Sequence, residues 1–82
     1  MLAAIRMPKM SDIDEYKILR FHHKVGDIVK KGEIFMDVQL DDGTERNVGF
    51  YLGGKITEIN VSVGSYVRED YLLGVMEDGV EP

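Results

Sequence analysis

The chain has 82 residues, a formal net charge of −5 from 15 acidic and 10 basic residues, and no cysteine. This length predicts one small domain. The lack of cysteine excludes disulfides, thiol nucleophiles and cysteine-based metal sites, and it fits a cytoplasmic protein. The acidic balance argues against nucleic acid or an anionic membrane surface as a partner, and no apolar run approaches the length of a membrane span.

Short runs rich in Val, Ile, Tyr and Phe alternate with nine glycines, and no window keeps a helical period. Such spacing favours an all-β sandwich or barrel. The sequence predicts strands near Ala3–Met7, Tyr16–Phe21, Asp27–Val29, Ile34–Leu40, Thr44–Phe50, Lys55–Val61, Tyr66–Val67 and Tyr71–Met76.

A hairpin forms the centre of this plan, because Ile34–Leu40 and Thr44–Phe50 flank the turn signal Asp41-Asp42-Gly43. Glycine accepts a positive φ without steric cost, and aspartate tolerates it better than most residues. We expect a loop of two or three residues. Four carboxylates gather around this hairpin, namely Asp37, Asp41, Asp42 and Glu45. Their spacing matches no calcium-binding loop, so we interpret them as solvated charges and expect no metal site.

The chain also repeats itself at an offset of 38 residues, with Lys17–Val38 matching Lys55–Met76 without a gap. Identical pairs include Ile18 and Ile56 as well as Gly26 and Gly64. Each copy reads as strand, Val-Gly turn, short strand, turn, strand. Two such copies predict half-domains that pack face to face around a pseudo-twofold axis.

Other side chains invite weaker interpretations. His22 and His23 are adjacent at the end of a predicted strand, so they face opposite sides and we expect them to bind no common metal. The aromatic residues lie in or beside the strands and are expected to pack in the core. Phe50-Tyr51-Leu52 would be a contact patch if it were exposed. No nucleophile with a nearby base is evident, so no catalytic residue is predicted.

Three stretches resemble lipoyl domains, namely Ile5–Ser11 (IRMPKMS), Lys24–Glu33 (KVGDIVKKGE) and Gly54–Ile59 (GKITEI) followed by Val63-Gly64. The resemblance covers roughly residues 5 to 76. It implies a flattened barrel of two four-stranded sheets with quasi-twofold symmetry, the biotinyl/lipoyl fold. It also implies a role in the acyltransferase component of a 2-oxo-acid dehydrogenase complex, where a lysine at the hairpin tip carries lipoate.

The acceptor position departs from that family pattern. Counting forward from Gly26 places it on Asp42, and counting back from Gly54 places it on Gly43. Neither residue can form the lipoyl amide, so we expect no cofactor at this tip. The alternative is a lipoyl or biotin carrier modified on another lysine, for which Lys9, Lys31 and Lys55 are the candidates.

The function expected from the sequence is that of a non-catalytic, lipoyl-like module that binds a protein partner or supports assembly. In lipoyl domains, acidic residues near the tip help a partner dehydrogenase recognise the domain, and Asp41 and Asp42 keep that character. We expect a single domain over residues 1–76. The acidic segment 77–82 would be a tail or the start of a linker.

Overall fold

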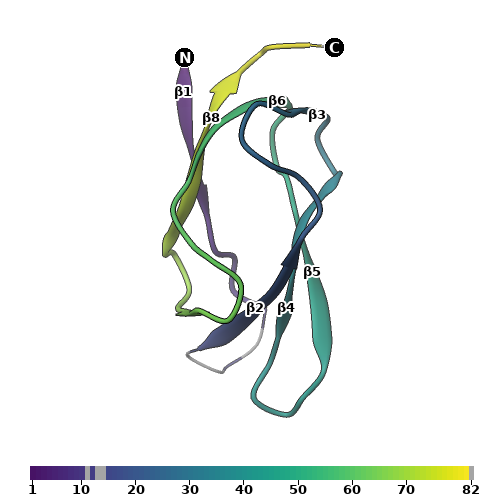
Figure 1. Cartoon of the computed structure of the whole chain (residues 1–82), viewed down its shortest axis with the longest axis vertical. Helices are drawn as coiled ribbons and strands as arrows, with labels where there is room; N and C mark the ends of the chain where they lie inside the picture. The colour runs from purple at the N-terminus through teal and green to yellow at the C-terminus, as the bar shows by residue number, and fades with distance from the viewer. Residues whose placement is uncertain (11, 13–14, 82) are drawn as a thin grey trace.

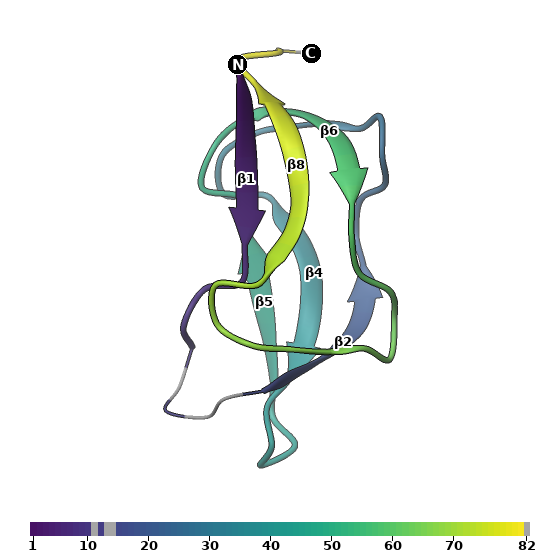
Figure 2. The same cartoon turned by 90° about the vertical axis from the view of Figure 1, so that its left-hand side faces the viewer.

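The structure, a computed structural model, describes residues 1–10, 12 and 15–81. Within these residues it contains strands and turns but no helix. Two four-stranded antiparallel sheets face each other in orders β1-β8-β6-β3 and β5-β4-β2-β7 (Figures 1 and 2). The strands are β1 Leu2–Arg6, β2 Tyr16–Phe21, β3 Ile28–Val29, β4 Ile34–Gln39, β5 Glu45–Gly49, β6 Gly54–Ile59, β7 Tyr66–Val67 and β8 Leu72–Asp78. The predicted all-β flattened barrel is confirmed.

The sequence repeat appears as a pseudo-twofold relation between the sheets, since β6, β7 and β8 begin 38 residues after β2, β3 and β4. The two halves do not pack as separate units, however. Each contributes its short strand to the sheet of the other, because β3 pairs with β6 and β7 pairs with β2. A half-domain therefore completes its own sheet only in the presence of its partner half.

Reciprocal hydrogen bonds hold the two Val-Gly turns in place. The Gly26 amide donates to the Ile56 carbonyl at 2.8 Å, and the Gly64 amide donates to the Ile18 carbonyl at 2.8 Å. Both glycines have positive φ, 98° and 90°. Each turn is thus anchored on the central strand of the other repeat, as the tight reversals expected from the sequence require.

The core lies between the sheets and repeats the same symmetry. Corresponding positions of the two repeats are buried in pairs, such as Ile18 with Ile56 and Phe35 with Leu73. The hydrophobic residues of the core are Ile5, Met7, Tyr16, Ile18, Val29, Phe35, Met36, Val38, Leu40, Val48, Phe50, Ile56, Val67, Leu73 and Met76. Burial of this surface is the main driving force for a domain of this size.

Three aromatic residues contradict the expected core packing. Tyr51, Tyr66 and Tyr71 are exposed, whereas Tyr16, Phe35 and Phe50 are buried. A tyrosine can lie at the surface because its hydroxyl group needs a polar partner. The hydroxyl of Tyr51 donates a hydrogen bond to the Ala4 carbonyl of β1. The Phe50-Tyr51-Leu52 segment is therefore not a uniform surface patch, since Phe50 belongs to the core.

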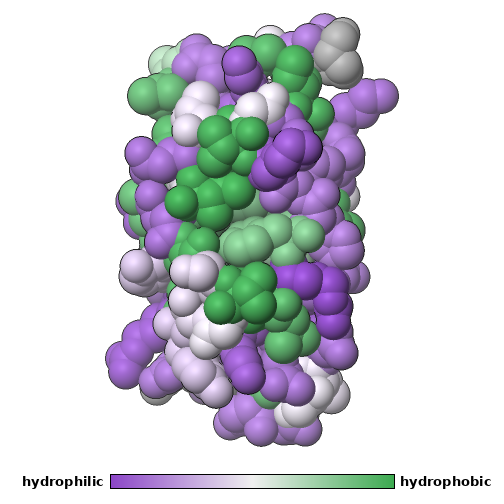
Figure 3. Space-filling view, in the orientation of Figure 1, coloured by the Kyte–Doolittle hydropathy of each residue, from purple (hydrophilic) through white to green (hydrophobic). Residues whose placement is uncertain are grey.

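The two ends of the barrel differ. Both termini lie at the upper end in Figure 1, and the β4–β5 turn lies at the lower end. Hydrophobic residues gather along the middle of the face in Figure 3, while the lower end is mostly hydrophilic.

Strand β8 runs to Asp78, so the last strand extends beyond the predicted end at Met76. None of the described segments forms a helix that could cross a membrane.

Candidate functional site

The tip of the β4–β5 hairpin is a three-residue loop, as predicted. The Leu40 amide donates to the Thr44 carbonyl at 2.8 Å, and the Gly43 amide donates to the Leu40 carbonyl at 3.0 Å. Gly43 has φ 90°, which explains why glycine follows the two aspartates. Asp41, Asp42 and Gly43 are all exposed and lie at the extreme end of the molecule (Figure 2).

The carboxylate of Asp42 turns back onto the loop. Its Oδ1 accepts hydrogen bonds from the Thr44 amide at 3.0 Å and from the Thr44 hydroxyl at 2.7 Å. The hydrogen bond from the Thr44 hydroxyl is the main reason that the pKa of Asp42 is lowered, and the Thr44 amide adds to the effect. Asp42 therefore stabilises the turn in its ionised form and keeps a negative charge at the tip.

Asp37 is unlike the aspartates of the tip, because its side chain is only 8% exposed. Its Oδ2 lies 2.5 Å from Arg20 Nη1 and 2.8 Å from His22 Nε2, and its Oδ1 accepts a hydrogen bond from Asn47 Nδ2 at 2.6 Å. Burial acts to raise the pKa of Asp37, but these hydrogen bonds outweigh burial and lower the pKa to about 2. The network joins β2, β4 and β5 across the outer face of their sheet.

The four carboxylates interpreted as one solvated group are thus separated. Arg20 pairs with Asp37 and also with Glu45, whose Oε1 lies 3.0 Å from Nη1. Only Asp41 and Asp42 remain as tip charges. Among the residues that the structure describes, no three His, Asp or Glu side chains are grouped as a metal site would require.

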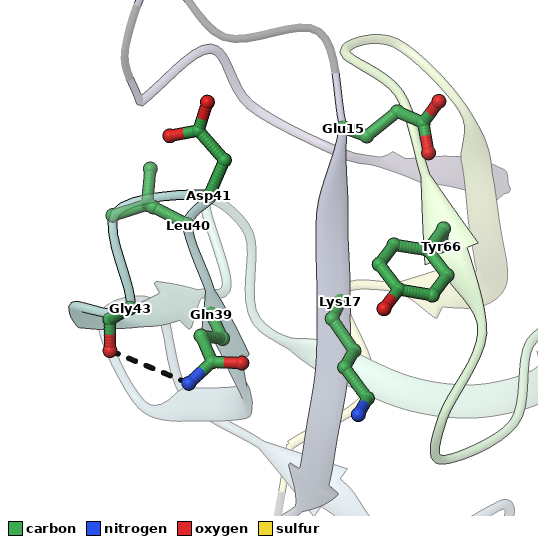
Figure 4. Close-up of a pocket in the computed structure, with 7 residues that line it drawn as sticks. All are labelled: Glu15, Lys17, Gln39, Leu40, Asp41, Gly43 and Tyr66. Atoms are coloured by element: carbon green, nitrogen blue, oxygen red, sulfur yellow. Dashed lines mark hydrogen bonds between the residues drawn. The ribbon is translucent and has the colours of Figure 1, made fainter.

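A groove of about 500 Å³ lies beside the tip, over the outer face of β2 (Figure 4). Strand register places Tyr66, Lys17 and Gln39 in one row across β7, β2 and β4. The residues that line the groove are Glu15, Lys17, Gln39, Leu40, Asp41, Gly43 and Tyr66. Apart from the tip residues, sequence reasoning missed this group, because its members come from three separate segments.

Comparison with known proteins identifies the fold's family. A family model described as "Biotin-requiring enzyme", Biotin_lipoyl, matches residues 3–76. The chain belongs to the biotinyl/lipoyl domain family. It is 29% identical over 73 residues to the dihydrolipoyllysine-residue acetyltransferase component of the pyruvate dehydrogenase complex of Cupriavidus necator. That match covers 89% of this chain but 13% of the relative.

A solved structure agrees with this assignment. The lipoyl domain of the 2-oxoglutarate dehydrogenase complex of Azotobacter vinelandii superposes with a TM-score of 0.71 and 28% identity. The match covers 94% of this chain and all of that one. The chain is thus a lipoyl domain of the type found in acyltransferase components of 2-oxo-acid dehydrogenase complexes.

The connection between β4 and β5 contains no lysine. Lipoate and biotin are joined to proteins through the amine of a lysine. Between the end of β4 and the start of β5 stand the three loop residues Asp41, Asp42 and Gly43 with Leu40 and Thr44 on either side, and none of these residues has a side-chain amine.

The lysines considered as alternatives lie elsewhere. Lys9 is exposed in the connection from β1 to β2, and its Nζ lies 3.8 Å from Asp12 Oδ1. Lys31 lines a groove together with Gly79 and Val80, close to the C-terminus at the opposite end. Lys55 lies in β6 and pairs in register with Glu77.

The two histidines have separate partners, as their adjacent positions predict. His22 contacts Asp37, whereas His23 Nδ1 lies 3.2 Å from Asp27 Oδ2 and its Nε2 lies 3.6 Å from Glu33 Oε1. Strand β2 ends at Phe21, so both histidines follow the strand rather than close it. Each ring thus contacts its own carboxylates and shares none with the other.

Proposed function

We propose that this lipoyl domain is not lipoylated at its tip and acts as a protein-binding or assembly module of a 2-oxo-acid dehydrogenase complex. The observation that carries the proposal is the tip itself. The hairpin keeps its shape and exposure, yet Asp42 and Gly43 occupy the two positions on which the acceptor can fall. The Asp42 carboxylate is engaged with Thr44, so it has a structural role of its own.

Without an attached arm, the domain acts by binding rather than by catalysis and needs no cofactor. The charges of Asp41 and Asp42 are exposed at a protruding end, where they can steer a basic surface of a dehydrogenase component into contact. We also propose that residues 1–76 form a single domain, which β8 extends to Asp78. The acidic segment 77–82 is then the end of that strand followed by a tail or the start of a linker, and the protein is cytoplasmic.

The second candidate function is a carrier domain modified on Lys9. Lys9 lies in a connection between strands, whereas Lys55 lies within β6 and Lys31 in the two-residue turn between β3 and β4, and this favours Lys9 over the other two. A swinging arm on Lys9 would start from a connection between strands rather than from a hairpin tip.

Binding of a dehydrogenase component tests the main proposal. We expect the ¹⁵N-labelled domain to bind the purified decarboxylating component of the Cupriavidus necator pyruvate dehydrogenase complex, with line broadening concentrated on residues 40–44. Removing both tip charges in Asp41→Asn/Asp42→Asn should weaken the complex at least about tenfold, because charge steering and pairing are lost together. Titration followed by nuclear magnetic resonance measures both effects.

Glu81→Gln is the matched control, since it removes one negative charge near the opposite end, and it should leave the affinity unchanged. Binding that is equally strong in the tip variant, or broadening that maps to the end with the termini, would contradict docking through the tip.

A further inference from the structure

The groove beside the tip combines apolar walls with opposite charges at its two ends. Leu40 is only 5% exposed and contributes to the lining, while Tyr66, which also lines the groove, is 64% exposed. In Figure 4 Asp41 and Glu15 flank the upper end of the groove from opposite sides, and the Lys17 ammonium extends away from both. The groove therefore has an acidic end with an aromatic wall nearby.

The pseudo-twofold symmetry provides an internal comparison. A second groove of about 510 Å³ lies at the other end of the barrel, lined in part by Gly53, Gly79 and Glu81. These residues stand 38 positions after Glu15, Asp41 and Gly43. In the second groove, Gly53 and Gly79 stand where Glu15 and Asp41 stand in the tip groove, so the fold accepts glycine at both positions. The two carboxylates are not required to form the barrel, so they are available for recognition.

The charges in the tip groove are only partly compensated within the chain. Glu15 Oε1 lies 3.9 Å from Arg68 Nη2, but both side chains are largely exposed, so this pair is weak. In the described part of the chain, neither Asp41 nor Lys17 forms an ion pair. An arginine entering the acidic end would lie between the negative charges of Asp41 on one side and Glu15 on the other, with the Tyr66 ring on the Glu15 side for its planar guanidinium to stack on.

We propose that the tip groove binds an arginine side chain presented by an extended segment of the partner protein. The inference rests on the proposed function and names the chemistry that the domain recognises beside its tip. Lys17 and Gln39 then face the main-chain carbonyls of the same segment, because they continue the groove away from the acidic end. Shape, charge and the aromatic wall together select arginine over a neutral side chain.

A short peptide tests this directly. N-acetyl-Gly-Arg-Gly-amide, titrated into the ¹⁵N-labelled domain, should give saturable shifts at Lys17, Gly43 and Tyr66. The citrulline analogue, which has the same shape without the charge, should give none. Glu15→Gln/Asp41→Asn should weaken binding of the arginine peptide at least about fivefold, whereas Lys30→Gln/Lys31→Gln in the opposite groove should not. Equal shifts with citrulline, or shifts spread over the opposite groove, would overturn the proposal.

The Glu15→Gln variant separates this inference from docking through the tip, because Glu15 lies in the groove but outside the hairpin. Loss of dehydrogenase binding in Asp42→Asn, with full binding in Glu15→Gln and no peptide response, leaves tip docking intact and refutes the arginine groove. Peptide binding without any dehydrogenase binding supports the groove and refutes the choice of partner.

Discussion

Replacing Gly54 with alanine is expected to destabilise the domain strongly, as is the same change at Gly74, where a Cβ would also meet a backbone oxygen. A Cβ at Gly54 would lie 2.2 Å from the Glu77 carbonyl oxygen, where β6 pairs with β8 in the middle of the sheet. The three nearest atoms all belong to the backbone of Glu77 and Asp78, so no side chain can rotate out of the way. We expect a loss of about 3 kcal/mol, out of a total of roughly 4–12 kcal/mol for 82 residues.

Thermal unfolding followed by circular dichroism measures this effect, and the expected loss corresponds to a fall in Tm of roughly 12–24 °C. Gly49→Ala is the matched control, since its Cβ would meet the nearest atom at an ordinary 3.5 Å. If the two variants had the same Tm, the close approach of the β6 and β8 backbones at Gly54 would be wrong.

The Asp37→Asn variant is expected to lose about 2 kcal/mol at neutral pH, because a buried carboxylate that accepts charge-assisted hydrogen bonds is replaced by an amide. The amide nitrogen would face the guanidinium of Arg20 or the amide of Asn47 and leave one donor unpaired. Urea unfolding at pH 7 measures the difference.

The loss of stability in the Asp37→Asn variant should also depend on pH. The pKa of Asp37 is about 2 in the folded protein, below about 3.9 in an unfolded chain, so its stabilising contribution is present above the unfolded value. That contribution is lost as the pH falls from about 5 to about 2. The stability difference between wild type and Asp37→Asn should therefore shrink over this range.

Glu45→Gln serves as the control for this network, because Glu45 also pairs with Arg20 but is 54% exposed. It should cost less than about 0.5 kcal/mol. A difference between wild type and Asp37→Asn that stayed constant from pH 7 down to about pH 2 would refute the assigned role of the carboxylate.

Most of the fold follows from local patterns. Strands such as Ile34–Gln39 and Gly54–Ile59 are short β-favouring runs bounded by turn residues, and the 38-residue repeat predicts two similar halves related by a pseudo-twofold axis. The exchange of β3 and β7 between the halves could not be predicted in this way. Both are two-residue strands, and their partners are chosen by the long-range contacts of the Gly26 and Gly64 turns.

The sequence predicted only the part of the site that is formed by residues adjacent in the chain. Asp41, Asp42 and Gly43 form a turn whose geometry depends on neighbouring residues, and the structure places them at the tip as expected. The pairing of Arg20 with Asp37 depends on a register that shifts between Ile18 and Arg20. Simple alternation cannot locate such a shift, so periodicity did not reveal this pair. The exposure of Tyr66 was missed because a propensity scale does not distinguish the two faces of a strand.

The most direct test of the central claim is the intact mass of the chain after co-expression with a lipoyl ligase and free lipoate. The wild-type mass should be unchanged, while Asp42→Lys, which restores an amine at the tip, should gain one lipoyl group. Asp42 is the better position to restore because Gly43 has a positive φ that disfavours lysine. A lipoyl group on the wild-type chain, mapped by peptide digestion to Lys9, Lys31 or Lys55, would contradict the account and establish a carrier domain.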